Sequence, residues 1–123
     1  MNITVLKSKI HKVEITDCNL NYEGSCEIDE NILNMAGIGL YEQIHIYNVN
    51  NGKRFVTYAI RGEAGSGIIS LNGAAARLGM VGDVIVICAY GEIHESEIKD
   101  HFPSIVHFKN EDESVDKLNW PTP

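Results

Sequence analysis

Short strand-like segments separated by glycine turns recur through most of this chain, and they limit it to folds built on a β-sheet. Residues 3–15 alternate in polarity as a half-buried strand does, and Val84 to Ala89 is the most β-branched run, typical of a core strand. Ile44 to Val49 and Arg54 to Ile60 are two further strand-like runs, and Asn51-Gly52 between them predicts a type I′ hairpin turn. A chain of 123 residues is enough for one domain, and the pattern favours a mainly-β barrel with short helical insertions.

Smaller elements complete the predicted domain. A helix is expected from Glu30 to Ala36, because Asp29 is a suitable N-cap and Gly37 is a suitable stop. The other expected elements are a strand over 68–71, a turn with helical character over 72–78, a short polar helix over 92–99 and a strand over 105–108. We expect the domain to span residues 1–109 and the acidic tail, 110–123, to be loose or draped on the surface.

Charge and composition argue against several classes of protein. The net charge is −7, so the chain as a whole repels nucleic acid and anionic membranes. No apolar run approaches the roughly 20 residues that span a bilayer, and the first residues lack the features of a signal peptide. We therefore expect a cytoplasmic protein with no nucleic-acid or membrane partner. The three cysteines are too scattered for a disulfide framework, and His94 and His101 fit no standard ligand spacing, so no metal is expected.

The glycine-rich stretch from Gly62 to Gly67 has some features of a phosphate-binding loop. It lacks the Lys-Ser/Thr ending of a P-loop, and no long helix follows it to offer a dipole. A plain turn is the simpler interpretation. A nucleotide- or phosphate-binding module built on this turn remains one alternative function.

A different chemistry is possible at Tyr22-Glu23-Gly24-Ser25-Cys26. Glycine permits strained backbone conformations, which can bring the hydroxyl of Ser25 against the carbonyl carbon of Gly24. An N-to-O acyl shift then forms an ester, β-elimination leaves dehydroalanine, and hydrolysis gives a pyruvoyl group at a new chain end. A Gly-Ser pair alone usually marks only a turn, so this chemistry needs support from other residues.

Several blocks of residues, in order and at characteristic spacing, provide that support. The blocks are Lys9-Ile10-His11, Leu20-Asn21-Tyr22-Glu23-Gly24-Ser25, Asn48-Val49, Asn51-Gly52-Lys53-Arg54-Phe55, Thr57-Tyr58-Ala59-Ile60, Asn72-Gly73-Ala74-Ala75-Ala76 and Val81-Gly82-Asp83-Val84-Ile85-Val86. Each block is weak alone, but their joint occurrence is highly specific. Through them the sequence closely resembles the pyruvoyl-dependent aspartate 1-decarboxylase family, from about Met1 to Phe108.

The resemblance implies a fold, a reaction and an assembly. The fold is a six-stranded double-psi β-barrel whose chain cuts itself between Gly24 and Ser25 into a β-chain (1–24) and an α-chain (25–123). Ser25 becomes a covalent pyruvoyl group, which serves as the cofactor without pyridoxal phosphate or a metal. The reaction converts L-aspartate to β-alanine and CO2, supplying a precursor of pantothenate and coenzyme A. The implied assembly is a homotetramer with active sites between subunits.

The resemblance also implies roles for individual residues. Ser25 and Tyr58 are the catalytic residues, with Tyr58 as the acid that protonates the product carbon. Gly24, Ser25 and Thr57 serve processing, with the Thr57 hydroxyl supporting the carbonyl oxygen of Gly24. The residues expected around the substrate are Lys9, His11, Arg54, Thr57, Asn72, Gly73, Ala74 and Ala75. The two cations among them hold the substrate carboxylates, for which a planar guanidinium is well suited, and the histidine is an adjacent polar support.

Two points stay open. Strand alternation puts Arg54 and Tyr58 on one face of their strand and Thr57 on the other, which strand twist or a site at a subunit boundary would accommodate. Tyr47 occupies a position where tryptophan is expected in the family. The alternative interpretation is a barrel of the same fold that is never processed and only binds a small anion.

Overall fold

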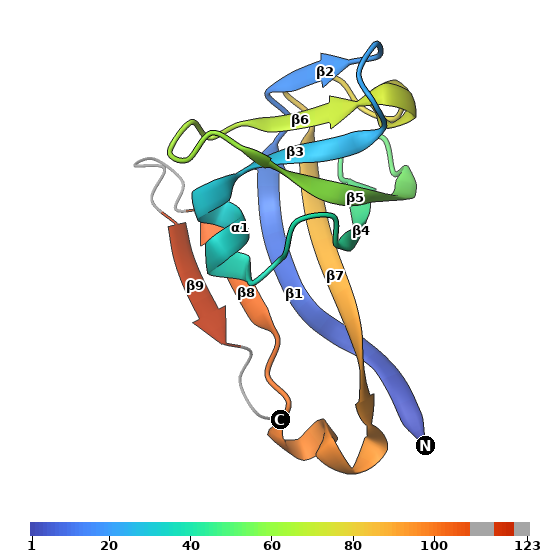
Figure 1. Cartoon of the computed structure of the whole chain (residues 1–123), viewed down its shortest axis with the longest axis vertical. Helices are drawn as coiled ribbons and strands as arrows, with labels where there is room; N and C mark the ends of the chain where they lie inside the picture. The colour runs from blue at the N-terminus through green and yellow to red at the C-terminus, as the bar shows by residue number, and fades with distance from the viewer. Residues whose placement is uncertain (109–114, 120–123) are drawn as a thin grey trace.

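The computed structural model describes residues 1–108 and the backbone of residues 115–119, and most of this chain is in strands (Figure 1). The strands are β1 (Asn2–Glu14), β2 (Asp17–Asn19), β3 (Ser25–Asp29), β4 (Gln43–Asn48), β5 (Arg54–Gly62), β6 (Ile69–Asn72), β7 (Val84–His94), β8 (Ser104–Phe108) and β9 (Val115–Asn119). The helices are α1 (Glu30–Ala36) and the 3-10 helices η1 (Gly73–Arg77) and η2 (Glu95–Asp100). The mainly-β class with short helical insertions is confirmed.

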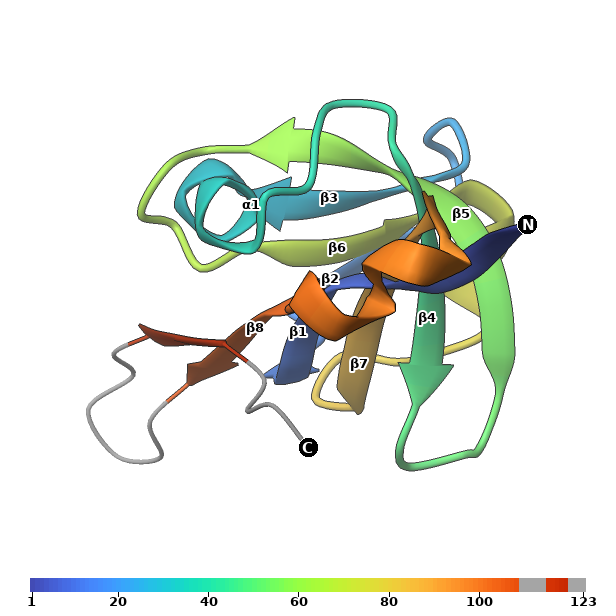
Figure 2. The same cartoon turned by 90° about the horizontal axis from the view of Figure 1, so that it is seen from below.

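Hydrogen bonding joins the nine described strands in the order β2-β6-β3-β5-β4-β7-β1-β8-β9. β2, β3 and β6 run across the molecule, β1, β4 and β7 lie steeply to them, and β5 curves from one group to the other (Figure 1, Figure 2). The ladder therefore has nine strands and is open, whereas a barrel of six was expected. Six strands, from β6 through β1, are consecutive in this order; β2 extends one end, and β8 and β9 extend the other.

Strand β2 continues the long strand β1 after two intervening residues. One of them, Thr16, donates its backbone N–H to the carbonyl of Ile69 at 2.8 Å, and Ile69 N donates to Thr16 Oγ1 at 2.9 Å. β2 then pairs in parallel with β6, while β1 pairs antiparallel with β7. One continuous stretch of chain therefore forms one end of the six-strand run, as β1, and borders the other end, as β2. This arrangement lets a short chain enclose a core.

The core between the strands is aliphatic. Alternate residues of the central strands are fully buried, as the period of two along a strand requires. They include Ile10, Ile44, Ile46, Ile85, Ile87 and Val106. The adjacent positions Lys9, Tyr47 and Arg54 therefore point to the opposite face of the sheet. This face carries the polar and aromatic side chains from which part of the candidate site is built.

The hairpin between β4 and β5 is confirmed, but its predicted turn type is wrong. A type I′ turn needs positive φ at both central residues, whereas Gly52 has one (76°) and Asn51 does not. The loop is longer because the side chain of Asn48 accepts hydrogen bonds from the N–H groups of Asn50 (2.9 Å) and Asn51 (3.3 Å). Gly52 N then donates a hydrogen bond to the carbonyl oxygen of Asn48 at 2.9 Å.

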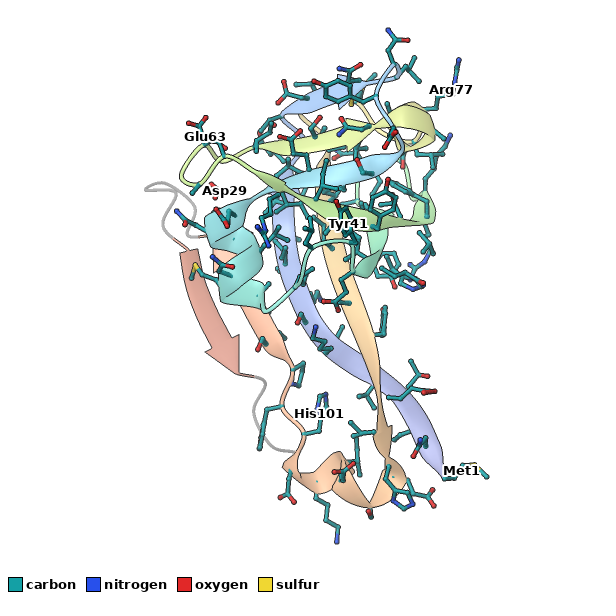
Figure 3. The ribbon with its side chains drawn as sticks, in the orientation of Figure 1. Met1, Asp29, Tyr41, Glu63, Arg77 and His101 are labelled. Carbon is teal, nitrogen blue, oxygen red and sulfur yellow. The ribbon has the colours of Figure 1, made fainter. Side chains whose placement is uncertain are left out.

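Helix α1 begins and ends as predicted, at the N-cap Asp29 and at Gly37, whose φ is 70°. The Asp29 carboxylate also binds the glycine-rich turn: Oδ1 accepts from Asn31 N (2.8 Å) and Gly65 N (3.1 Å), and Oδ2 from Gly67 N (2.8 Å). Figure 3 shows Asp29 at the start of α1, near the loop that carries Glu63. The amides that a phosphate would use are bonded to the chain's own carboxylate, which argues against the phosphate-binding interpretation.

These hydrogen bonds predict a pH-dependent contribution of Asp29 to stability. Burial would raise the pKa of this carboxyl, but the backbone N–H groups of the turn and of α1, Gly67 first, outweigh burial and hold the pKa below its ordinary value. Because the pKa is lower in the folded than in the unfolded chain, the contribution is full above the unfolded pKa, about 4, and is lost as the pH falls through the folded pKa. Asp29→Asn should therefore lower the free energy of unfolding by ~1–3 kcal/mol at pH 7.

Urea unfolding of both proteins at matched concentrations, from pH 7 to pH 3, tests this expectation. The difference between them should shrink below about pH 4. Asp17→Asn is the matched control, because that side chain is exposed and bonds only to its neighbour Thr16 among the described residues. A difference that stays constant with pH would contradict the assigned cause.

The C-terminal part departs from prediction in two places. The polar helix expected over 92–99 begins only at Glu95, because β7 continues through His94 in its pairing with β1. These two strands form a long arm with η2 and the N-terminus at its far end (Figure 1). Residues 115–119 of the acidic tail form β9, which pairs with β8, and the rest of 110–123 lies outside the described residues. Within the described part, no helix is long and apolar enough to cross a membrane.

Candidate active site

Ser25 lies at the start of β3 and is buried, with 1% of its surface exposed. Its hydroxyl donates to the carbonyl oxygen of Glu23 at 3.3 Å and accepts a hydrogen bond from Asn72 Nδ2 at 3.3 Å. Asn72 is paired with Ser25 across the β3–β6 ladder, and its Oδ1 accepts from Ser70 Oγ at 2.8 Å. The serine hydroxyl is therefore held by a side-chain network inside the protein, directly after Gly24.

Gly73 presses against the residue before that serine. Its φ is +64°, and a Cβ on it would lie 2.6 Å from Gly24 Cα and 2.7 Å from Gly24 N, closer than side-chain atoms can approach. The left-handed conformation thus lies at Gly73 and not at Gly24, where the sequence analysis placed the backbone strain. The close approach of Gly73 to Gly24 confines the segment that contains the Gly24–Ser25 bond.

Thr57 and Tyr58 lie on β5, which runs parallel to β3 with Cys26 paired to Ala59. This pairing begins two residues after Gly24 on one chain segment and two residues after Thr57 on the other, so Thr57 lies near the start of β3. The sequence alone put Thr57 and Tyr58 on opposite faces, yet both line one shallow, open depression of about 540 Å³. The Tyr58 ring lies 6.3 Å from that of Tyr41, which lines the same depression. Tyr41 is labelled in Figure 3.

Lys9 and Arg54 both lie on the sheet face opposite the core. Lys9 is paired with Cys88, whose thiol pKa is raised by burial and lowered in part by a hydrogen bond to Tyr90 and by the charges of Lys9 and Arg54. Both cations therefore lie close enough to this thiol to influence its pKa. The Arg54 guanidinium carbon also lies 3.9 Å from the centre of the Tyr47 ring, a cation–π contact.

His11 lies two residues beyond Lys9, paired with His107 across the β1–β8 ladder, and the two rings are 4.9 Å apart. Its Nδ1 is buried without a hydrogen-bond partner among the described residues. Burial first, and then the charges of Lys9, His107 and Lys12, lower the pKa of His11. The buried nitrogen therefore has hydrogen-bonding capacity that the described residues leave unused.

Apart from Thr57 and Tyr58, which line their own depression, the predicted residues form two groups. Ser25 and Asn72 are hydrogen-bonded, with Gly24 and Gly73 in contact beside them; in the same loop Ala75 is buried and Ala74 is exposed. The other group lies on the outer face of the sheet and consists of Lys9, His11 and Arg54. Within the described residues no hydrogen bond or ion pair joins one group to the other, and Arg54 lies four residues, roughly 13 Å along an extended strand, from Tyr58.

Two residues that the structure adds to the site were not predicted. Ser70 orients Asn72, and Tyr90 bonds to Tyr47. Ser70 reads in sequence as an ordinary strand residue. Tyr90 follows the apolar run of β7 in the sequence. Its contact with Tyr47 could be found only from the pairing of β4 with β7.

Comparison with known proteins decides the family. The family model described as aspartate decarboxylase matches residues 1–115 of this chain. The chain belongs to the aspartate decarboxylase family. The match extends past Phe108, where the resemblance recognised in the sequence ended.

Individual relatives agree with this assignment. Aspartate 1-decarboxylase 2 of Polaromonas sp. (strain JS666 / ATCC BAA-500) is 57% identical over 103 residues, or 84% of this chain and 82% of the relative. Aspartate 1-decarboxylase of Polaromonas naphthalenivorans is 54% identical over 112 residues, 91% of this chain and 87% of the relative. That of Methylococcus capsulatus is 55% identical over 107 residues, 87% of this chain and 85% of the relative.

The family membership confirms that the chain is an enzyme, a carboxy-lyase of the aspartate decarboxylase type. It does not favour the alternative of a silent barrel that only binds a small anion.

Proposed function

We propose that this family member converts L-aspartate to β-alanine and CO2 by means of a pyruvoyl group that it makes from its own Ser25. The observation that carries the proposal is the buried Ser25 hydroxyl, bonded to Asn72 and following a glycine that is pressed against Gly73. Such a hydroxyl is confined beside the peptide bond that it would attack. The residues around Ser25 are therefore compatible with formation of the pyruvoyl group.

Formation of the group balances without any added oxidant or reductant. Ser25 Oγ attacks the carbonyl carbon of Gly24, the C–N bond breaks, and an ester replaces the amide. β-Elimination then releases the carboxylate of Gly24 and leaves dehydroalanine, whose hydrolysis consumes one water and releases ammonia. Thr57 supports the developing charge on the Gly24 oxygen; its position on β5, two residues before the Ala59 that pairs with Cys26, supports this role.

The pyruvoyl group, once formed, supplies an electron sink for the bond to the departing carboxylate. The side chains around it orient the substrate. Arg54 grips one carboxylate with its planar fork and Lys9 holds the other by charge. His11 is an adjacent polar support, whose buried Nδ1 has no hydrogen-bond partner among the described residues, and Tyr58 delivers the proton that completes β-alanine.

The separation of the two residue groups supports a homotetramer as part of this proposal. Ser25 and Asn72 lie inside the ladder between β3 and β6, whereas Lys9 and Arg54 lie on the outer face of β1 and β5. A cation on the outer face of one subunit can serve the serine of a neighbouring subunit if the two surfaces meet. Each active site would then be shared between subunits.

One set of measurements on the purified protein tests the proposal. The intact mass should give a fragment of residues 1–24 and a second that begins at position 25 and is lighter by one ammonia than simple hydrolysis would make it. The same sample should form β-alanine from L-aspartate and scatter light as a tetramer. An uncut chain that is inactive would refute the proposal, and an active monomer would refute the shared site alone.

A further inference from the structure

Three side chains on the outer sheet face form a chain of contacts that ends at Arg54. The guanidinium carbon of Arg54 lies 3.9 Å from the centre of the Tyr47 ring. Tyr47 Oη lies 2.6 Å from Tyr90 Oη, a short hydrogen bond in which either hydroxyl can donate. The Tyr90 ring in turn meets His45 edge-on, with the ring centres 4.9 Å apart at 81°.

The Tyr47 ring is the contact that orients Arg54. Arg54 is exposed, and no hydrogen bond or ion pair fixes its guanidinium among the described residues. A guanidinium held by stacking alone follows the ring beneath it, so its direction depends on how firmly that ring is held. The hydroxyl of Tyr90 holds the far end of the Tyr47 ring.

We propose that Tyr90 is a positioning residue for substrate binding, whose hydroxyl fixes the Tyr47 ring and thereby the guanidinium of Arg54. This inference rests on the proposed function, in which Arg54 grips a substrate carboxylate. Tyr47 and Tyr90 both line an open depression of about 720 Å³ on the outer face, beside Thr4 and Glu92. The aromatic pair is therefore open to the side from which a substrate or a neighbouring subunit would approach.

Tyr90 acts through Tyr47 and not by exchanging protons. Burial, followed by the hydrogen bond to Tyr47, raises the pKa of Tyr90, so its phenol stays neutral over the range in which enzymes work. A neutral phenol in a fixed hydrogen bond orients its partner but cannot serve as a general base. Removing the hydroxyl should accordingly alter affinity and leave the pH profile unchanged.

Tyr90→Phe is the direct test, because it keeps the ring and its edge contact with His45. The KM for aspartate should rise roughly three- to tenfold, the range that one lost hydrogen bond gives, while kcat stays within about twofold. Self-cleavage, followed by intact mass, should be complete. Thr4→Val is the matched control, because it removes a hydroxyl from the same depression without touching the aromatic pair.

A double variant separates positioning from a general structural role. Tyr47→Phe keeps the face beneath Arg54 and removes the same hydrogen bond, so Tyr47→Phe with Tyr90→Phe should resemble either single variant. Additive effects, or an unchanged KM in Tyr90→Phe, would overturn the inference. Crystal structures of the wild type and Tyr90→Phe should show the guanidinium displaced in the variant. If the wild type makes no β-alanine the proposed function fails, whereas an undisplaced guanidinium refutes the positioning role by itself.

Discussion

Replacing Ser25 by alanine is expected to leave a single uncut chain with no decarboxylase activity above background. Alanine lacks the hydroxyl that attacks the Gly24 carbonyl in the proposed reaction, so neither the ester nor the pyruvoyl group could form. The substitution removes one buried oxygen that bonds to Asn72 and Glu23, and the methyl group still fits the start of β3. The loss should therefore concern chemistry and not the fold.

Intact mass and a β-alanine assay measure both consequences on the same sample. Ser66→Ala is the matched control, because its hydroxyl likewise donates to a nearby backbone carbonyl, that of Glu63, but lies in an exposed turn. That variant should cut and react as the wild type does. A Ser25→Ala chain that is still cut at the same bond would show that another group attacks it.

Arg54→Lys and Thr57→Val are expected to separate the two reactions. Cleavage involves no external anion, so the Arg54→Lys chain should be cut normally. Its rate of decarboxylation should fall by about 100-fold or more, because a small misplacement of the substrate can cost that much in rate. Lysine keeps the charge but has neither the planar fork for a carboxylate nor the flat face that lies on Tyr47. Thr57→Val keeps the volume and strand propensity and removes the hydroxyl, so it should block cutting and, with it, activity.

A denaturing gel and the β-alanine assay distinguish these outcomes. Arg61→Lys is the control for the arginine, since it lies on the same strand with an exposed side chain near Glu30. Thr4→Val serves again for the threonine. Normal decarboxylation by Arg54→Lys would remove the role given to Arg54, and normal cutting by Thr57→Val would remove that of Thr57, with the family assignment untouched in both cases.

Local physics accounts for the parts of the fold that the sequence predicted correctly. The N-cap at Asp29 and the left-handed Gly37 depend on neighbours within one turn, so both ends of α1 were predictable. The β4–β5 turn was not, because the side chain of Asn48 competes for the N–H groups of the loop and lengthens it. The end of β7 was mistaken for a helix, since its pairing with β1, far away in the chain, decides the matter.

The candidate site shows the same division. The Gly24-Ser25 pair and its companions were recognised as motifs, but the sequence placed the backbone strain at Gly24, whereas the positive φ belongs to Gly73, 49 residues later in the numbering. Thr57 and Tyr58, which strand alternation alone puts on opposite faces, both line one open depression in the structure. Tyr90 carries no motif, and its contact with Tyr47 depends on the register of β4 against β7.

The passage of β1 into β2 has a consequence for a protein that cuts itself after Gly24. The 24-residue peptide formed by the cut would contain both strands, together with Lys9 and His11. Before the cut, these strands pair with β7, β8 and β6 of the same chain. After the cut, the peptide would be held only by these backbone ladders and by buried side chains such as Ile10, Val13 and Ile15. Recovery from denaturation then requires two separate molecules to meet, so its yield would depend on concentration. A processed protein of this kind is assembled once, as a single chain, and afterwards persists as a complex of two.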